Sequence, residues 1–486
     1  MFLDCSIFAG DKSIMSMSED KPKKKRTKKA AAEGEGSGEK EHKPNWRETR
    51  ATYEDIQRYL SDLIHLRHNV ITGQQEFRVP EMDPFSLLAQ LYPTGATPLD
   101  EWRSADTWQT VNDRLVNSLL MVISKLKETS DHAIWKVIGS DFVPLFNPFT
   151  NYLSRLPPWD EDTNPILDLS MTVTVKGSPD EQLLFYVCLR KWLVGMIAGW
   201  LEEGKVNQEI LVLVGRQGIY KTTWFGHLMP PELQPYFHSN TSFGNMTKDE
   251  VLKLSQYGLI CCEELDTMKP SEMNRLKWAV TTTVTDERRA YAHASERRKH
   301  IASYCGTGNH IRFIDDDTGT RRWLPFEVET IRSPHDYPFD HRAIFAQAYA
   351  LYLQGFQYWF DEQEMQLMSR HNERFEVAKL EREAISKYYR PPRNDERGEF
   401  VSTLEIMEKV GGLLAQRLTT NKLGRAMTAL GFESMRSRGQ RGYVVIGYEG
   451  DEIKANKALL AFEAKPESES TSVTASEIFA TNDTIF

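Results

Sequence analysis

Cysteine is scarce in this chain, with five among 486 residues. Their spacing matches no metal-binding pattern, which argues against a zinc-stabilised fold. Cys261 and Cys262 are adjacent within an apolar run, and we expect both to be buried thiols. Structural disulfides and cysteine frameworks belong to oxidising compartments, so this usage favours a cytoplasmic protein.

Long hydrophobic runs are also missing. No apolar run reaches the roughly 20 residues that a membrane-spanning helix needs. Residues 1–9 are apolar but include Asp4 and no basic segment, which makes them a poor signal peptide. The chain has no excess of basic residues either, since its net charge is −9. Nucleic-acid binding must therefore depend on local basic clusters rather than on the overall charge.

Composition divides the chain into six expected segments, within the two to four domains that its length allows. The first contains the basic run 21–29, which is either a nucleic-acid arm or import signal, or simply a solvated tail. In order, the segments are a disordered basic arm (1–44), a mainly helical N-terminal or collar region (45–205), an α/β core (206–330), a helical extension (331–395), a small module (396–450) and a largely disordered tail (451–486).

Within the N-terminal region, three patterns predict local structure. Two short apolar runs around a Thr-Gly turn suggest a β-hairpin over 69–79. Helical spacing of apolar residues predicts a helix over 108–120. A long apolar stretch, 181–201, predicts another helix, in which Trp192 and Trp200 are expected to lie in the core.

The most informative stretch is 209–223. An apolar run ends at Gly215, a loop containing Gly218 follows, and Lys-Thr-Thr opens what reads as a helix. Main-chain N–H groups at the start of a helix lack intrahelical partners and attract anions. The pattern resembles the phosphate-binding sequence GxxxxGK[ST], except that Tyr220 stands in place of the second glycine. The predicted nucleotide-binding residues are Gly215, Gln217, Gly218, Tyr220, Lys221, Thr222 and Thr223.

In this interpretation Lys221 reaches the β- and γ-phosphates of a nucleoside triphosphate, and the Thr222 hydroxyl binds Mg²⁺. The alternative from the residues alone is a strand-to-helix turn with an incidental lysine.

A second apolar strand, within 257–266, ends in carboxylates. Triphosphate hydrolysis needs one acid to hold Mg²⁺ and another to orient the attacking water. Glu263 and Glu264 occupy these positions, with Glu263 the expected metal ligand and Asp266 in reserve. The alternative is a strand followed by an acidic helix cap.

Two polar features follow the next apolar strand, 301–309. Asn309 at its end can sense the γ-phosphate or position the attacking water. Arg321 and Arg322 come soon afterwards, and one of them could supply positive charge to the transition state, within the subunit or across an interface. A solvated or ion-paired arginine pair is the alternative.

Between the acidic strand and the asparagine strand lies a densely basic segment, 286–300, with an interleaved tyrosine. Such charges contact phosphates, and aromatic rings stack on bases. An exposed, ion-paired helix is the alternative. The predicted DNA-binding residues of this segment are Arg297, Arg298, Lys299 and His300.

Taken in order, these motifs resemble the virulence-associated protein E family of bacterial mobile elements and phages, which is similar to superfamily 3 helicases. The resemblance covers roughly 50–390. It is carried by Phe146–Leu153 with Leu156–Asp160, the 215–223 loop, Glu264–Asp266, Gly306–Asn309, Thr318–Trp323 and Ala343–Tyr349.

The resemblance implies an ATP- and Mg²⁺-dependent enzyme that acts on DNA during replication of a mobile element. It further implies a hexameric ring, ATP between subunits, an arginine from the neighbouring subunit, and a hairpin before the sensor strand that grips DNA. On that template Lys221, Glu263, Glu264, Asn309 and either Arg321 or Arg322 are catalytic. Tyr220, and Cys261 where relatives often carry an acid, depart from the pattern.

The module 396–450 reads as a helix opening near Phe400, a second helix over 418–432 capped by Thr419 or Thr420, and a hairpin with a basic tip. This order suggests a winged helix-turn-helix. Its second helix could enter a major groove while the wing arginines contact phosphate. Winged helices also mediate protein contacts. The predicted DNA-binding residues here are Arg436, Arg438 and Arg441.

We therefore expect an α/β P-loop NTPase core of the superfamily 3 helicase or AAA+-like type, with a helical N-terminal region and a C-terminal winged-helix module. The leading hypothesis is a hexameric, ATP-dependent DNA helicase or translocase acting on single-stranded or forked DNA. The alternatives are an ATPase switch that assembles on DNA without unwinding it, as an initiator or an anti-phage defence component, and a nonhydrolysing scaffold.

Overall fold

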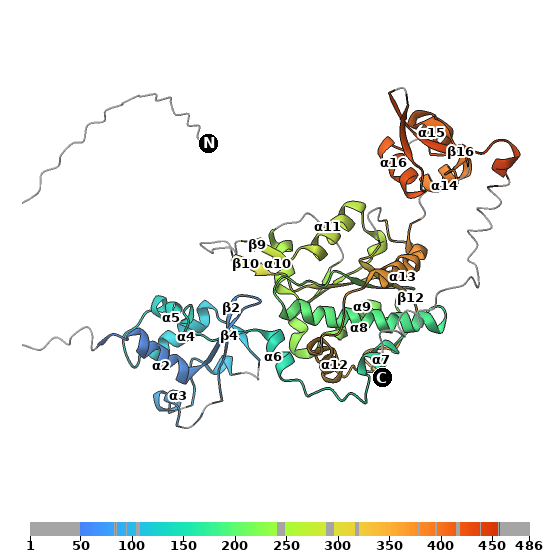
Figure 1. The fold of residues 1–486 in the computed structure, drawn as a ribbon. Helices are drawn as coiled ribbons and strands as arrows, with labels where there is room; N and C mark the ends of the chain where they lie inside the picture. The colour runs from blue at the N-terminus through green and yellow to red at the C-terminus, as the bar shows by residue number, and fades with distance from the viewer. Residues whose placement is uncertain are drawn as a thin grey trace, which may run out of the picture.

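The computed structural model describes residues 49–81, 83, 85–93, 95–103, 107–240, 248–287, 296–315, 320–377, 380–393, 396–414, 418–437, 439–454 and 456. The expected basic arm, most of the tail and Arg438 lie outside the described residues. The described part has a mixed α/β architecture, in which a central sheet is layered between helices (Figure 1).

The central sheet has six strands in the order β5-β12-β6-β11-β8-β7. All neighbouring pairs are parallel except β5, which runs antiparallel to β12. In a parallel sheet the carboxyl ends of the strands meet at one edge, so the ends of β6, β11 and β8 lie together. The strands are β5 (Val173–Val175), β12 (Trp323–Ile331), β6 (Ile210–Val214), β11 (Ser303–Gly308), β8 (Leu259–Cys262) and β7 (Phe237–Asn240).

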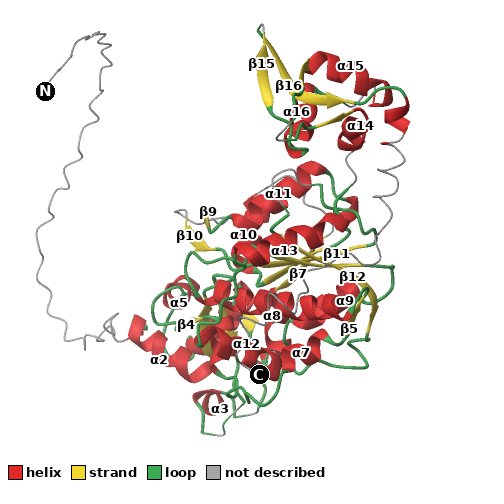
Figure 2. Cartoon of the chain, turned by 45° about the vertical axis from the view of Figure 1, so that its right-hand side comes forward, coloured by secondary structure: helices red, strands yellow, loops and turns green. Residues whose placement is uncertain are grey.

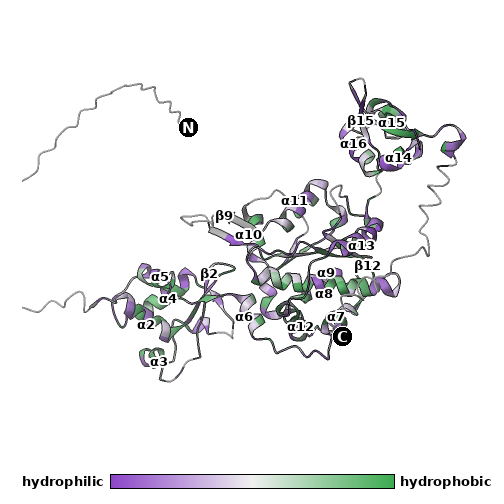
Figure 3. Cartoon of the chain, viewed as in Figure 1, coloured by the Kyte–Doolittle hydropathy of each residue, from purple (hydrophilic) through white to green (hydrophobic). Residues whose placement is uncertain are grey.

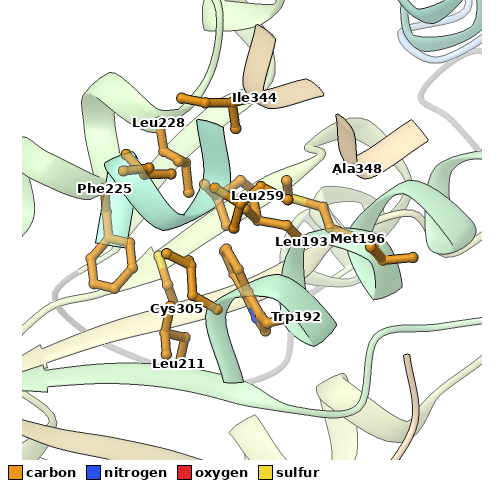
Figure 4. Close-up of a cluster of buried hydrophobic side chains, with 14 of the residues drawn as sticks. Trp192, Leu193, Met196, Leu211, Phe225, Leu228, Leu259, Cys305, Ile344 and Ala348 are labelled. Carbon is orange, nitrogen blue, oxygen red and sulfur yellow. The ribbon is translucent and has the colours of Figure 1, made fainter. Parts of the chain in front are cut away.

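Both faces of this sheet are covered by helices, as Figure 2 shows. All five residues of β6 are buried, and alternate side chains enter two different cores: Leu211 and Leu213 face one, while Val212 and Val214 face the other. Helices α8 (Pro179–Leu201), α9 (Lys221–Leu228) and α12 (His341–Leu353) contribute to the first core (Figure 4), and α10 (Lys248–Gln256) and α11 (Pro270–Thr281) contribute to the second. α13 (Glu362–Asn372) contacts β12.

Helix α8 lies beneath the sheet and confirms the helix predicted over 181–201. By length and apolar composition this helix could cross a membrane, but 89% of its most apolar 18-residue stretch is buried inside the protein. Figure 3 shows the hydrophobic residues along the chain. The indole N–H of Trp192 donates to the Tyr304 carbonyl at 3.1 Å, and that of Trp200 donates to the Gly258 carbonyl at 3.2 Å. The two tryptophans are therefore core residues that tie the helix to the sheet, as predicted.

The N-terminal elements build a smaller sheet, in the order β3-β2-β1-β4, with a separate hydrophobic core. The predicted hairpin is present, but its first strand ends at Asn69 rather than starting there. The helix predicted from 108 starts at Asp113, because Asn112 caps it and 109–110 pair with β2. The elements are α2 (Tyr53–Leu63), β1 (His65–Asn69), β2 (Gln74–Arg78), α3 (Leu87–Leu91), β3 (Gln109–Thr110), α4 (Asp113–Ile123), α5 (Asp131–Ile138) and β4 (Leu145–Phe146).

The expected boundary of the N-terminal region at 205 does not coincide with the division between these cores. α6 (Pro148–Ser154) and α7 (Pro165–Ser170) contribute Phe149 and Ile166 to the first core of the central sheet. A two-stranded hairpin of β9 (Val284–Glu287) and β10 (Glu296–Lys299) precedes β11.

The C-terminal residues fold around another core, made of three helices and an antiparallel sheet in which β14 and β15 both pair with β16. Thr419 caps the second predicted helix, as expected, whereas Phe400 lies in a strand and not in a helix. The elements are α14 (Leu380–Tyr388), β13 (Tyr389–Arg390), β14 (Glu399–Ser402), α15 (Thr403–Leu414), α16 (Thr420–Ala429), β15 (Ser434–Ser437) and β16 (Gln440–Gly447).

Candidate nucleotide site and candidate DNA-binding surfaces

The 215–220 loop connects the end of β6 to the start of α9, where the sequence predicted a phosphate-binding turn. Lys221 is the first residue of α9 and is only 7% exposed. Its ammonium donates to the carbonyls of Gly215 and Arg216, both at 2.7 Å, and to Oδ1 of Asn309 at 3.3 Å. The lysine therefore folds back across its own loop and contacts the end of the neighbouring strand β11.

Backbone geometry explains the residue types in this loop. A side chain on Gly215 would bring its Cβ to 2.6 Å from the Val328 carbonyl oxygen, so glycine is required there by close packing. Gly218 has a φ of +85°. Tyr220 also adopts the left-handed conformation, with φ +69°, which glycine usually supplies. The tyrosine is 43% exposed, so it keeps the glycine-like backbone without packing its ring inside the loop.

Thr222 and Thr307 connect the first turn of α9 to β11. Their hydroxyl oxygens lie 3.5 Å apart. Because Cys262 pairs with Gly306, the next residues along the two strands are Glu263 and Thr307. Neighbouring strands lie about 4.8 Å apart, so this register places the predicted metal ligand Glu263 beside Thr307, whose hydroxyl contacts Thr222, the other predicted ligand.

The three acids after β8 have different surroundings. Glu263 is half-buried and accepts a hydrogen bond from the Ser239 hydroxyl on β7. Glu264 is exposed and has a left-handed backbone, with φ +54°. The Asp266 side chain is only 2% exposed and accepts from the main-chain N–H groups of Asn309 at 3.0 Å and His310 at 3.2 Å. The reserve candidate, Asp266, is thus the carboxylate that fixes the turn after β11.

Electrostatics connect the same groups. Burial lowers the pKa of the Lys221 ammonium below its ordinary value, and the nearby Asp266 carboxylate opposes that shift. Ser239, Thr307 and the positioning role of Asp266 were not identified from the sequence. Ser239 lies within β7 and in no motif, and Thr307 lies within the Gly306–Asn309 motif but was given no role, so only the sheet order reveals where both lie.

Arg321 and Arg322 lie where β6 begins, at the opposite end of this strand from the 215–220 loop. The Arg322 carbonyl accepts from the N–H of Ile210, the first residue of β6, at 2.7 Å, whereas the candidate loop follows the last residue of that strand. Five strand residues span about 16 Å, which is longer than an arginine side chain. Neither arginine can therefore reach the 215–220 loop of its own subunit.

Residues 160–377 match the family model of the virulence-associated protein E-like domain. The matched segment contains the 215–220 loop, the acids after β8, Asn309 and both arginines. This part of the chain therefore carries a virulence-associated protein E-like domain.

A search of curated proteins found no match. Among solved structures, three apo structures of the NrS-1 C-terminal region are similar to the chain and each is covered over 98% of its length. Their sequence identities are 14%, 12% and 13%, their TM-scores are 0.43, 0.42 and 0.40, and they cover 80%, 81% and 81% of this chain.

The β9–β10 hairpin belongs to the virulence-associated protein E-like domain, and its predicted DNA contacts have very different surroundings. His300 is fully buried and Arg298 is 7% exposed, so neither side chain is presented to solvent. Lys299 is half-buried, and burial lowers the pKa of its ammonium to about 8, opposed by Glu202 and Glu203. The side chain of Arg297 lies outside the described residues.

The C-terminal residues lie beyond the segment that matches the virulence-associated protein E-like domain. Arg436 and Arg441 are exposed and lie directly opposite each other across β15 and β16. Like charges in this position repel, and an anion between them would relieve the repulsion. Arg438, between these strands, lies outside the described residues.

Proposed function

We propose that this protein is a Mg²⁺-dependent ATPase that acts on DNA as a superfamily 3-type helicase or translocase, in replication of a mobile element or phage. The observation that carries the proposal is the convergence of Lys221, Asn309 and Asp266 at the carboxyl edge of the sheet, beside the 215–220 loop. The virulence-associated protein E-like domain supports the biological setting, which in turn favours the cytoplasm.

Three observations support a triphosphate as the ligand of this loop. Gly215 has no room for a side chain, Tyr220 keeps the left-handed turn, and the Lys221 ammonium is held within reach of the loop carbonyls. N–H groups at the start of α9 would meet phosphate oxygens, and Gln217 and Thr223 flank them. The loop would therefore be the P-loop of an NTPase core.

Thr222 and Glu263 would hold Mg²⁺, which polarises the phosphates and neutralises charge that develops during transfer. The described residues contain no group of three or more histidine, cysteine or acidic side chains placed to hold a metal ion, and Mg²⁺ in nucleotide sites usually has few protein ligands besides phosphates and water. Glu264, exposed at the same edge, would orient the attacking water. Asn309 would sense the γ-phosphate through the contact that it now makes with Lys221.

Arg321 and Arg322 complete this proposal only in an assembly. Because they lie at the opposite edge of the sheet from the loop, an arginine that stabilises the transition state must come from a neighbouring copy. A closed ring, hexameric as in superfamily 3 proteins, provides that neighbour for every subunit.

DNA contact is proposed for two places. The β9–β10 hairpin would grip a strand, and Arg297 and Lys299 stay candidates. The C-terminal helices and sheet follow the order of a winged helix, in which α16 would enter a groove and Arg436, Arg438 and Arg441 would contact phosphates on the wing.

ATP hydrolysis measured with and without single-stranded DNA tests the proposal. We expect DNA-stimulated turnover that is lost in Lys221→Ala and retained in Lys205→Ala, which removes an exposed lysine. Absence of turnover in the wild-type protein with any nucleotide and DNA would overturn the ATPase and favour a scaffold.

Strand displacement on forked DNA then separates a motor from a switch. We expect displacement that requires ATP and Lys221. DNA-stimulated hydrolysis without displacement would instead identify an initiator or defence ATPase that assembles on DNA and does not unwind it.

A further inference from the structure

The turn between β1 and β2 docks the N-terminal sheet onto the central domain. Asn69, at its start, is fully buried although it is polar. Its side-chain oxygen accepts from the N–H groups of Ile71 at 3.0 Å and Thr72 at 3.2 Å, which fixes the shape of the turn. Its amide nitrogen donates to the Tyr236 hydroxyl at 2.7 Å and to Glu76 at 2.7 Å. A buried, fully bonded amide of this kind specifies one geometry.

The next contact joins this turn to the β9–β10 hairpin. The Ile71 side chain belongs to the hydrophobic core of the central domain and not to that of the N-terminal sheet. The Ile71 carbonyl accepts a hydrogen bond from the guanidinium of Arg298 on β10, at 3.3 Å, and Arg298 is 7% exposed. The arginine charge is therefore directed into the protein, toward the turn.

The same turn also reaches the acids of the candidate site through Tyr236. Tyr236 immediately precedes β7 and its carbonyl accepts from Gly258, the residue before β8, at 2.9 Å. At the far end of β7, Ser239 contacts the Glu263 side chain, and the Asn240 carbonyl accepts the Glu263 N–H at 2.9 Å. One turn thus contacts both the hairpin and the strand that supports Glu263.

We infer that Arg298 is a positioning residue, which anchors the β9–β10 hairpin to the Asn69–Gly73 turn, and that this turn holds the hairpin and β7 in a fixed relation. The sequence predicted a DNA contact for Arg298, whereas its burial and its bond to Ile71 give it an internal partner. The value of a fixed hairpin for moving DNA depends on the proposed function, but the anchoring itself does not.

Amide hydrogen exchange without nucleotide or DNA tests the anchoring directly. Arg298→Gln and Asn69→Ala should each speed exchange in β7 and β10 by roughly tenfold, the factor expected for one lost buried hydrogen bond. Both substitutions act on one network of hydrogen bonds. The increase in exchange rate in the double variant should therefore not exceed the product of the two single increases, and it should be smaller than that product if the bonds depend on each other. Tyr236→Phe, which removes only a hydroxyl, covers the case in which Asn69→Ala fails to fold.

Matched variants separate anchoring from general destabilisation. Gln74→Ala, exposed at the start of β2, should leave exchange in β10 unchanged. Arg298→Lys keeps a charged donor on a longer side chain than glutamine has, and should restore most of the protection lost in Arg298→Gln. If Arg298→Gln leaves exchange in the turn and in β10 as in the wild-type protein, the anchoring is wrong.

The salt dependence of DNA binding decides between the anchor and a DNA contact. A lost phosphate contact lowers the slope of log affinity against log salt by roughly 0.7–0.9. We expect Arg298→Gln to leave this slope unchanged, and a fall of that size would overturn the inference. Loss of ATPase activity in every form of the protein, with the exchange results as expected, would refute the proposed function and leave the anchor standing.

Discussion

The main-chain N–H of Asn309 donates to the buried carboxylate of Asp266 at 3.0 Å. This bond fixes the turn that follows β11, and it does so beside Lys221, whose ammonium contacts the Asn309 side chain. The Asp266 carboxylate, which follows β8, therefore sets the position of Asn309, which follows the neighbouring strand β11.

Replacing that carboxylate should disturb both stability and turnover. In Asp266→Asn we expect a loss of about 1–3 kcal/mol in the free energy of unfolding, because N–H groups that bonded a charged acceptor lose it. Turnover should fall by roughly 100-fold as Asn309 moves from its place. Thermal denaturation and ATP hydrolysis measure the two effects. Asp336→Asn, at an exposed position, is the control, and an unchanged Asp266→Asn would contradict the positioning role.

The left-handed conformation of Tyr220 makes a prediction about stability. Glycine adopts φ +69° without strain, whereas any residue with a Cβ pays about 1 kcal/mol or more. Tyr220→Gly should therefore be more stable than Tyr220→Ala by about 1 kcal/mol, measured by denaturant unfolding. Both variants lack the ring, so their difference isolates the backbone. Equal stabilities would show that the loop relaxes to another conformation.

The distance between Arg322 and the 215–220 loop predicts complementation between subunits. Arg322→Ala should abolish turnover and retain nucleotide binding. Mixed with Lys221→Ala subunits it should recover part of the activity, because some interfaces then combine an intact loop with an intact arginine. Arg370→Ala, exposed on α13, should be active alone. No recovery in the mixture would exclude an arginine supplied by the neighbour.

Burial of His300 predicts a pH dependence of stability. Burial lowers the pKa of its imidazole below the ordinary value of 6.5. Below pH 6.5 the unfolded chain binds a proton that the folded chain does not, so stability is complete above this pH and falls as the pH drops toward the folded pKa. The slope is at most about 1.4 kcal/mol per pH unit.

Unfolding of the His300→Gln variant between pH 5 and pH 8 measures this contribution. The variant should lose less stability than the wild-type protein as the pH falls. His132→Gln, at an exposed position of α5, is the matched control for the loss of a histidine outside the core. An identical dependence in His300→Gln and wild type would contradict the assignment.

The arginines opposite each other on β15 and β16 predict a salt effect. Arg436→Gln should weaken DNA binding and lower its salt slope by roughly 0.9 if it contacts one phosphate of a duplex. Removal of one of two facing like charges should also raise the stability of the sheet slightly. Lys454→Gln, exposed and with the same charge change, should alter neither. A slope unaffected by Arg436→Gln would favour a protein partner for this surface.

Local signals in the sequence were sufficient to predict those elements whose structure depends on residues close together in the chain. Glycines, a lysine and an apolar run predicted β6, its loop and α9, and Thr419 marked the start of α16. Contacts between distant segments were not predictable in this way. Asn69 was expected to start a strand, whereas it is the last residue of β1, and its side-chain bond to Tyr236 joins residues 167 positions apart.

Charge was the least reliable guide for the same reason. Arg298, Lys299 and His300 look alike in the sequence, as members of one basic run, but the fold gives them a main-chain partner, two acidic neighbours and a fully buried site respectively. Which basic residue faces solvent depends on the distant segments that pack against the hairpin, and the sequence of the hairpin alone does not reveal them.

Arg322 lies near the beginning of β6, and Lys221 lies beyond its end. If ATP binds between subunits as proposed, a solitary copy carries an arginine with no phosphate to meet and a loop with no arginine. Dilution alone would switch such an enzyme off, and turnover per chain would climb steeply with protein concentration until rings close.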